Sequence, residues 1–495
     1  MGAALLFLPL MLIIILLIVT VRFLRPLKYA QPIPIAPFAL PLVGHLLRFI
    51  GNTSERGFWS IISSFEPDAR LTKLMFGPLP VILVQHPDLV QAVLRNEKMY
   101  DKPFPYDFFH LRHGLICERD GERWKQTRRL LNPAFKMKVL AEFVPIFDSR
   151  ARKLVDTLKP LADGSRDINL VEFVTRSSHE TIFSTSLGCN VEGRPGENEC
   201  FENFELIQNC VGMRLLRPEL FLEPVYRLCS NYDKEKKSRA ICTAFVDKLI
   251  QERCKKLSDN NNDSEENIQS HIFMDNLLHL QLNGQNLSDR DISDHLHTLM
   301  IAGYETSALT ICYTCLALAQ HPDIQNNVVA ELRDIFHSPS VELNLETLNR
   351  LEYTEMVIKE TMRLFPVIPI IARETGAPIV LDGVRIPRKQ VLIMSFHSLH
   401  RRKDCWGDEP DRFDPERFRA EACQARHPYA YLPFSGGYRN CIGNRYGMIS
   451  LKTALTRLLL EYEIRTNIKR KDMRFRYEIS MRLVGPYTVQ LIKRS

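Results

Sequence analysis

One cysteine stands in a glycine-rich stretch late in the chain, where its neighbours suit a ligand better than a core side chain. Cys441 lies in FSGGYRNCIG, with Arg439 two positions before it and Gly443 two positions after it. Glycines let the backbone fold tightly and approach a bound group closely. The amphipathic helix expected at 444–462 follows at once, and its positive N-terminal end can stabilise a negative sulfur. The pattern predicts a reactive thiolate rather than a buried apolar cysteine.

An acid and an alcohol interrupt the longest apolar helix pattern. This helix is expected to run from a Ser288 cap, with Asp291 three residues on, to about residue 320. In its middle, Ala302–Thr306 reads AGYET. Glycine in a helix interior costs about 1 kcal/mol relative to alanine, and a buried acid costs more unless it is paired. The flanking residues are apolar on nearly every face, which favours a function in the interior over an exposed turn.

Two arginine motifs could fix the cysteine loop in place. Glu360 and Arg363 in KETMRLFP are three residues apart and share a helix face, where they can pair. Alone, such a pair is usually a surface feature worth a few tenths of a kcal/mol. Arg417 lies in FDPERF, shortly before the cysteine. Its guanidinium could tie the loop to the helix by bidentate bonds to a carboxylate.

The elements that position these residues are mostly helical. Apolar runs around Gly77 and Pro78 predict one β-hairpin, and the Asp382–Gly383 pair predicts a turn in a second strand region. Periodic apolar spacing predicts helices between those regions and after Cys441. The polar stretch 258–270 is expected as a mobile surface loop, or alternatively as a domain linker. Strands on both sides of it favour one mainly α domain with a small β part.

Composition excludes two classes of protein. The 495 residues carry a net charge of +7, which is mild for this length and widely spread. No dense basic stripe is present, so nucleic-acid binding is not expected. The twelve cysteines show no regular spacing, which argues against a disulfide framework and for a reducing compartment. The chain is also long enough to bury a large core.

The N-terminus predicts membrane attachment. The uncharged apolar run from Ala3 to Val21 is just long enough to span a bilayer. Basic residues follow it directly, which places the remainder in the cytosol. A cleaved signal peptide fits less well, because a basic n-region and a small-residue cleavage site are lacking. We therefore expect a transmembrane anchor at 1–21, a basic and proline-rich extended hinge at 22–44, and a catalytic domain at 45–495.

Together these motifs resemble the cytochrome P-450 superfamily of haem-thiolate monooxygenases. The superfamily pattern F-x-x-G-x-R-x-C-x-G is met by Phe434, Gly437, Arg439, Cys441 and Gly443. The resemblance covers essentially the whole chain and implies the cytochrome P-450 fold. Further matches are the E-x-x-R helix at Glu360 and Arg363, the arginine turn at Arg417, the W-x-x-x-R helix at Trp124 and Arg128, and A-G-x-E/D-T at Ala302–Thr306.

The resemblance implies haem b as the cofactor, with Cys441 as the axial ligand of its iron. A thiolate ligand pushes electron density onto haem iron and favours O–O cleavage. On the opposite face, Gly303 would let the helix open for dioxygen, while Thr306 would donate a hydrogen bond and Glu305 would relay protons. The remaining residues implied to bind the cofactor are Phe434, Trp124, Arg128, Arg373 and Arg439, the arginines and the tryptophan through the haem propionates.

Within the superfamily, the chain looks most like an insect-type, divergent member of the clan that contains the fourth family, known for fatty-acid ω-hydroxylation and insect detoxification. The stretch Leu131–Phe135, LNPAF, carries this resemblance. In that family a glutamate that esterifies a haem methyl often stands at the position of Ala302. Alanine cannot form this ester, so the haem is expected to be non-covalent apart from the thiolate. A strictly ω-selective fatty-acid activity loses support with it.

The resemblance also implies an apolar substrate and an electron donor. Four aromatic residues in 101–115 would either contact the substrate or pack their own loop. The expected partners are NADPH-cytochrome P-450 reductase, docked on basic residues, and cytochrome b5, with the chain in the endoplasmic reticulum membrane. Two alternatives are a haem-thiolate isomerase or lyase that acts on peroxides without reductase, and a non-catalytic membrane-tethered binding protein. The aromatic residues are Phe104, Tyr106, Phe108 and Phe109; the basic ones are Lys125, Arg129, Lys136 and Lys138; His110, His113 and His400 are expected to be structural, and Cys312 and Cys315 to pack in the core.

Overall fold

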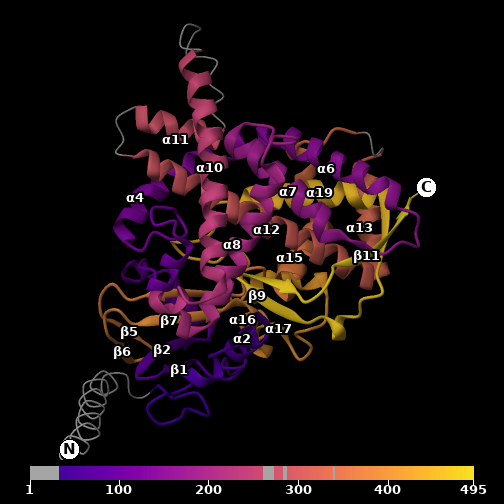
Figure 1. The fold of residues 1–495 in the computed structure, drawn as a ribbon. Coiled ribbons are helices and arrows are strands. Elements are labelled where there is room, and N and C mark those ends of the chain that lie inside the picture. Colours follow the sequence, from indigo (N-terminus) through magenta and orange to yellow (C-terminus); the bar gives the residue numbers. More distant parts are fainter. Residues whose placement is uncertain (1–32, 260–271, 283–286, 338–340, 495) are drawn as a thin grey trace, which may run out of the picture.

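The computed structural model describes residues 33–259, 272–282, 287–337 and 341–494, and in this part the chain is mainly helical with a small β part, as predicted (Figure 1). The polar stretch 260–270 and the predicted anchor at 1–21 lie outside these residues. The helices are α2 (Ser54–Ile62), α3 (Pro87–Leu94), α4 (Gly121–Leu131), α5 (Met137–Glu142), α6 (Val144–Leu158), α7 (Leu170–Leu187), α8 (Glu197–Leu216), α9 (Glu223–Tyr226), α10 (Ser230–Asp259), α11 (Phe273–Leu282), α12 (Asp289–Gln320), α13 (Pro322–Ile335), α14 (Leu345–Asn349), α15 (Glu352–Leu364), α16 (Phe396–Leu399), α17 (Lys403–Trp406), α18 (Ala420–Ala425) and α19 (Asn444–Glu461).

The helix α12 passes through the middle of the body and is the axis around which the other helices pack (Figure 1). Its start is fixed by the predicted cap: the Ser288 hydroxyl accepts from the Asp291 N–H, and the Asp291 carboxylate accepts from the Ser288 N–H. Most of its residues are buried, and it is helical along its whole length. The prediction of one long helix from Ser288 to Gln320 is confirmed.

The strands form a four-stranded sheet and three smaller groups. The four-stranded sheet has the order β1-β2-β7-β4, in which β2 and β7 are parallel and the other neighbours are antiparallel. Both predicted turns are confirmed: Gly77–Pro78 joins β1 to β2, and Asp382–Gly383, with positive φ at both residues, joins β5 to β6. The strands are β1 (Leu71–Phe76), β2 (Leu79–Val84), β3 (Ile168–Asn169), β4 (Ile370–Glu374), β5 (Ile379–Leu381), β6 (Val384–Ile386), β7 (Val391–Ser395), β8 (Tyr462–Arg465), β9 (Phe475–Glu478), β10 (Ser480–Leu483) and β11 (Thr488–Lys493).

The segment before α2 differs from the predicted extended spacer. Residues 33–44 turn back on themselves, with positive φ at Phe38 and Leu42, and Ile35 pairs with Lys73 of β1. Ile33 and Ala36 are buried against the body. Their apolar side chains gain more by packing on the sheet than the prolines gain from an extended backbone. Among the residues that the structure describes, none of the helices combines the length and the apolar character needed to cross a membrane.

The Glu360–Arg363 pair on α15 is a core element rather than surface decoration. Both side chains are fully buried, and Arg363 Nε lies 2.6 Å from Glu360 Oε2. Arg363 also donates to the carbonyl oxygens of His400, Pro410 and Arg412. The pair therefore organises the long irregular stretch that leads from α16 to the cysteine loop.

Arg417 secures the same stretch in a different way from the one predicted. Its Nε is 3.9 Å from Glu360 Oε1, so it makes no bidentate hydrogen bonds to that carboxylate. Its other nitrogens donate to the carbonyl oxygens of Trp406 and Glu409. Instead, the Asp414 N–H donates to Glu360 Oε1 at 2.8 Å. The predicted tie between Arg417 and a carboxylate on the helix is present as an ion pair with Glu360, but its bidentate geometry is wrong, because Arg363 and the Asp414 N–H occupy the Glu360 oxygens.

Replacing Glu360 with alanine leaves Arg363 as an uncompensated buried charge. We expect the Glu360→Ala variant to lose about 3–5 kcal/mol of unfolding free energy, measured by equilibrium denaturation followed by circular dichroism. Glu409→Ala is the matched control: its pair with Arg412 is 3.6 Å long and more than half exposed, so the loss should be below about 1 kcal/mol. Equal losses in the two variants would contradict this role of the buried pair.

Candidate active site

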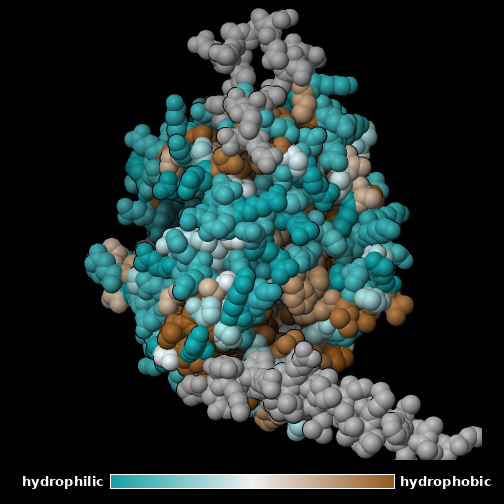
Figure 2. Space-filling view, turned by 90° about the vertical axis from the view of Figure 1, so that its left-hand side faces the viewer, coloured by the Kyte–Doolittle hydropathy of each residue, from teal (hydrophilic) through white to brown (hydrophobic). Residues whose placement is uncertain are grey.

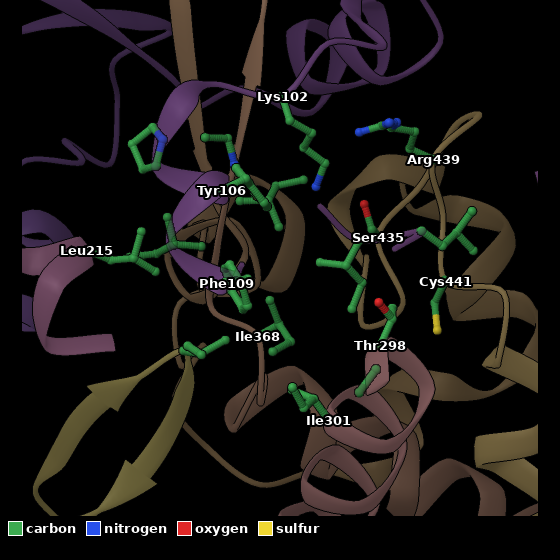
Figure 3. Close-up of a pocket in the computed structure, with 18 of the residues that line it drawn as sticks. Lys102, Tyr106, Phe109, Leu215, Thr298, Ile301, Ile368, Ser435, Arg439 and Cys441 are labelled. Atoms are coloured by element: carbon green, nitrogen blue, oxygen red, sulfur yellow. The ribbon is translucent and has the colours of Figure 1, made fainter. Parts of the chain in front are cut away.

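A large, mostly apolar cavity lies between α12, the cysteine loop and the loop that precedes α4 (Figure 3). Its volume is about 1140 Å³, which exceeds the range of an ordinary small-molecule pocket. Cys441 is on one wall, and Ala302, Glu305 and Thr306 are on the α12 wall. The structure therefore brings the cysteine loop and the AGYET sequence to one site, although they are far apart in the chain.

The cysteine loop is held in a tight conformation that points Cys441 into the cavity (Figure 3). The Cys441 N–H donates to the Phe434 carbonyl oxygen at 2.9 Å, which closes the loop, and the side chain of Phe434 lines the cavity. Gly437 has a φ of +66°, and a β-carbon there would lie 1.9 Å from the Leu94 carbonyl oxygen. Only glycine permits this approach to α3, which anchors the loop.

The electrostatics of Cys441 depart from the prediction. Burial raises the pKa of the thiol, although a hydrogen bond from the Gly443 N–H and the charge of Arg128 act in the opposite direction. The Gly443 N–H and Arg128 favour the thiolate as the sequence predicts, but they do not outweigh desolvation, so the predicted thiolate depends on the charge of a metal ion at the sulfur. A coordinating metal ion deprotonates a thiol outright. The site is therefore arranged for a cation that completes it.

Three cations converge beside the cysteine loop without any carboxylate to neutralise them. Lys102, Arg373 and Arg439 are largely buried, and none forms an ion pair with a described acidic residue. Burial, followed by the charges of Arg373 and Arg439, holds the pKa of Lys102 well below its ordinary value. Figure 3 shows the nitrogen ends of Lys102 and Arg439 turned toward the same part of the cavity. Such a cluster is stable only with an anion between its members.

Arg439 shows most clearly that a group belongs there. Its Nη2 donates to the Glu118 carbonyl oxygen at 2.6 Å, whereas Nε and Nη1 are buried without a partner. Its guanidinium lies 4.6 Å from the centre of the Trp124 ring, which also lines the cavity. A flat, dianionic group carrying a metal ion would satisfy these donors and Cys441 together. The residues present therefore fit the haem that the sequence implies.

Arg128 takes a different position from the other predicted propionate ligands. It donates from Nη1 to the Asn440 carbonyl oxygen at 2.7 Å, from Nη2 to Asn440 Oδ1 and from Nε to Asn132. These bonds attach α4 to the residue directly before Cys441. Arg128 also lines the cavity, and its hydrogen bonds hold the cysteine loop against α4.

The α12 wall shows no local opening. The Thr306 hydroxyl donates to the Ala302 carbonyl oxygen at 2.7 Å, and the helix continues through Gly303. A β-carbon at Gly303 would lie 2.5 Å from Ile182 of α7. Glycine thus leaves room for Ile182 of α7 to pack on α12. The helix is continuous through Gly303 here, and its opening for dioxygen stays a prediction.

Glu305 is buried, and its Oε1 is occupied. It accepts from the Ser480 hydroxyl at 2.8 Å and from Arg482 Nε at 2.6 Å. Burial raises the pKa of Glu305, and Arg482 is the main influence that lowers it. An acid at the cavity wall with a raised pKa is suited to exchanging protons.

The sequence left open whether the aromatic residues of 101–115 contact the substrate or pack their own loop, and the structure shows both arrangements. Phe104, Tyr106 and Phe109 line the cavity, whereas Phe108 packs on Phe221 and on the Arg214 guanidinium. Sequence reasoning missed three residues of the site: Lys102, Ser480 and Arg482. Nothing in the sequence distinguishes Lys102 from a surface lysine, since the charged side chains near it, Arg373 of β4 and Arg439 of the cysteine loop, are distant in the chain. The two hairpin residues are 175 and 177 positions from Glu305.

Other predicted residues lie outside the cavity. His400 is fully buried, accepts from the Leu432 N–H at 2.8 Å and contacts the Arg363 carbonyl oxygen, so its role is structural. Cys312 and Cys315 are fully buried in the main apolar core.

Comparison with known proteins agrees with the geometry. The family model described as "Cytochrome P450" matches residues 34–491. "Cytochrome P450 4c21" of Blattella germanica is 32% identical over 477 residues, covering 94% of this chain and 93% of that protein. "Cytochrome P450 4V2" of Homo sapiens is 29% identical over 486 residues, covering 96% and 92%. "Probable cytochrome P450 313a1" of Drosophila melanogaster is 30% identical over 470 residues, covering 92% and 93%.

Lys102 offers a test of the anion site. We expect the Lys102→Met variant to release haem roughly tenfold or more faster, because a charge-assisted hydrogen bond contributes about 1.5–3 kcal/mol. The measurement is the rate of haem transfer to an excess of apomyoglobin. Lys98→Met is the matched control, since Lys98 lies four residues earlier and is exposed. Identical release from Lys102→Met and Lys98→Met would contradict the assignment.

Proposed function

The chain belongs to the cytochrome P-450 family, and on this premise we propose that it inserts one oxygen atom into an apolar organic substrate with electrons from NADPH. Family membership makes it a haem-thiolate monooxygenase that binds haem b through a cysteine thiolate. The observation that carries the proposal is Cys441 on the wall of an apolar cavity beside three unneutralised cations. The reaction is RH + O₂ + NADPH + H⁺ → ROH + H₂O + NADP⁺, where RH is a fatty acid, a terpenoid or a xenobiotic.

Cys441 supplies the thiolate, and the haem it holds supplies the iron centre at which dioxygen is activated. Arg128 holds the cysteine loop through Asn440, and the Gly443 N–H donates to the sulfur. Lys102, Arg373 and Arg439 would neutralise the haem propionates, and the Trp124 ring lies against the Arg439 guanidinium. The residues proposed to bind the cofactor, which include Lys102 beside those predicted from the sequence, would thus form two groups: those that hold the loop and those that bind the carboxylates.

Thr306 and Glu305, on the α12 wall opposite Cys441, would deliver protons to the reaction. In the ground state the Thr306 hydroxyl donates to Ala302, so its oxygen can accept from a water in the cavity. Rotation about its side-chain bond would let it donate toward the cavity instead. Glu305 supplies the carboxyl group from which protons are replenished. Two protons are consumed for each water formed, so a pair of such groups is what the chemistry requires.

The cavity wall supports an apolar, extended substrate. Its lining is dominated by aliphatic and aromatic side chains, including Phe104, Phe109, Ile301 and Ile368. Ala302 leaves this point of the helix wall small, and position 302 itself offers no carboxylate for an ester to haem. Apolar walls discriminate only weakly between apolar molecules that fit the volume, so both a rigid terpenoid and a flexible fatty acid would be accommodated.

We further propose an NADPH-dependent flavoprotein reductase, with cytochrome b5 as a second donor, on the face of α4 and α5. Arg129, Lys136 and Lys138 are exposed there, and Lys125 is partly exposed beside Glu97. A basic face of this kind attracts an acidic partner and speeds their association at low ionic strength.

The same proposal includes attachment to the endoplasmic reticulum membrane. The apolar run 3–21 is long enough for an anchor. Figure 2 shows apolar side chains, in brown, gathered at the lower end of this face of the body. We call this the apolar patch. It borders the cavity, whose lining includes Leu79 and Leu222. An exposed apolar patch rimmed by polar residues marks a protein or membrane contact. The exposed apolar residues that we propose to make up this patch come from residues 38–50, 79 and 222–228: Phe38, Leu40, Leu42, Leu47, Ile50, Leu79, Leu222, Val225 and Leu228.

Turnover with two oxidant systems tests the reaction class. We expect purified enzyme with NADPH and reductase to form hydroxylated product from terpenoids or fatty acids, whereas a lipid hydroperoxide alone gives no rearranged product. The Thr306→Ala variant should still consume NADPH while product per NADPH falls about tenfold or more. Rearrangement of the hydroperoxide without reductase would favour the isomerase or lyase, and absence of haem would favour a binding protein.

Membrane contact can be measured separately from the anchor. We expect the chain beginning at residue 33 to bind phospholipid vesicles. The double variant Phe38→Asp, Leu228→Asp should bind them about tenfold or more weakly, because burying each of these apolar side chains in the membrane contributes about 1.5–3 kcal/mol of binding free energy. Val341→Asp is the control, since Val341 is exposed but lies outside the patch. Equal partitioning of all three proteins in a flotation assay would contradict the apolar patch as a membrane contact.

A further inference from the structure

The hairpin of β9 and β10 brings an arginine to the acid on α12. Arg482 of β10 lies with Nη2 2.5 Å and Nε 2.6 Å from Glu305 Oε1. The Ser480 hydroxyl reaches the same oxygen at 2.8 Å. Glu305 and Arg482 are both buried. A buried pair of this geometry fixes the direction of the carboxylate, because release would leave two uncompensated charges.

The three bonds to Glu305 use only one of its oxygens. The described residues give Oε2 no hydrogen bond, and Glu305 is part of the cavity lining. The carboxylate is therefore held at Oε1 and free at Oε2. This is the arrangement that a proton donor needs when it must keep its position while one oxygen exchanges protons with water.

Arg482 does not serve Glu305 alone. Its Nη1 pairs with Glu205 of α8, whose side chain is 50% exposed, and its Nε lies 3.7 Å from Glu478 of β9. One guanidinium thus serves three carboxylates, of which one is in solvent and one is on the cavity wall. Any change in its bond to Glu205 alters the field at Glu305.

The tip of the same hairpin forms part of the substrate cavity. Tyr477 and Ile479 line the cavity, and Ile479 has a φ of +69°, which is strained for a β-branched residue. A β-carbon at Gly212 of α8 would lie 2.5 Å from the Glu478 backbone, so glycine allows the tip to press against α8. Ile479 is one residue from Ser480, and a molecule in the cavity therefore touches the element that holds Glu305.

We propose that Arg482 is a positioning residue for proton delivery. From β10 it binds Oε1 of Glu305, so that Oε2 is left facing the cavity, and its charge is shared with Glu205. The proposal deepens the proposed monooxygenase function and rests on it for its catalytic consequence. Its structural part, the control of Glu305 by Arg482 and Glu205, stands independently of any turnover.

Every charged or titratable group that faces Glu305 enters the expected pH behaviour. Burial raises the pKa of Glu305, Arg482 opposes that rise and Glu478 adds to it. Tyr304 is neutral because burial raises its pKa, and His179, stacked 3.6 Å from Tyr304, is neutral because burial lowers its pKa to about 3. Loss of the Arg482 charge therefore moves the Glu305 titration to higher pH, and loss of the Glu205 charge moves it to lower pH.

Infrared difference spectroscopy of the haem-loaded protein measures this titration directly. The neutral carboxyl band of Glu305 is identified by its disappearance in Glu305→Gln. We expect Arg482→Met to raise the pH midpoint of this band by about one unit or more, and Glu205→Gln to lower it. Arg476→Met is the matched control: Arg476 lies opposite Arg482 in the hairpin and pairs with Glu478 but not with Glu305, so its loss should raise the midpoint much less than the loss of Arg482. An unshifted midpoint in Arg482→Met overturns the proposal.

Turnover then separates positioning from mere support of the fold. Arg482→Met should lower kcat and product per NADPH about tenfold or more while KM changes little, and Arg482→Lys should restore part of kcat. Equal losses in Arg482→Met and Arg476→Met, or a change confined to KM, overturn the catalytic part. If the wild-type protein shows no monooxygenase turnover at all, the proposed function fails, while the infrared midpoints still decide whether Arg482 controls Glu305.

Discussion

The organisation of this protein depends on the position of one thiol that the fold itself does not ionise. Desolvation raises the pKa of Cys441, so the sulfur needs a cation to become a strong ligand. The surrounding structure keeps the sulfur in place for that cation. Gly437 anchors the loop on α3, Arg128 binds it through Asn440, and the buried Glu360–Arg363 pair fixes the stretch that leads to it. Rigid support of this kind allows a metal centre to be bound without reorganisation.

Charge is unevenly distributed around the cavity, and the imbalance indicates where each ligand goes. Beside the cysteine loop, Lys102, Arg373 and Arg439 lack carboxylate partners, which suits a dianionic cofactor. On the α12 side, the described carboxylates Glu305, Glu205 and Glu478 share Arg482, and Glu478 also pairs with Arg476. In the proposed function, the first side would bind the cofactor, and the second would keep a titratable proton near the reaction. The apolar walls between them exclude water and admit an apolar substrate.

Local sequence patterns predict the elements well, because a cap, a turn pair or an apolar period is read within a few residues. The Ser288 cap of α12 and the Asp382–Gly383 turn are examples. Contacts between distant segments escape such reasoning. The reason for Gly303 is a side chain on α7, the partner of Glu305 is 177 residues away, and the proline-rich segment 33–44 folds onto β1. The family motifs name the residues of the site, but only packing shows that Arg417 binds carbonyl oxygens and that Lys102 joins the cofactor side.

The central claim is that the Cys441 sulfur binds haem iron as a thiolate, and the absorption spectrum of the reduced carbon monoxide complex tests it most directly. The account predicts the strongly red-shifted Soret band of a thiolate-ligated haem in the wild-type protein. It predicts loss of that band in a Cys441→Ser variant that retains haem, because a hydroxyl donates far less electron density to the iron. A Cys441→Ser protein with the unaltered red-shifted band, at equal haem content, would contradict it.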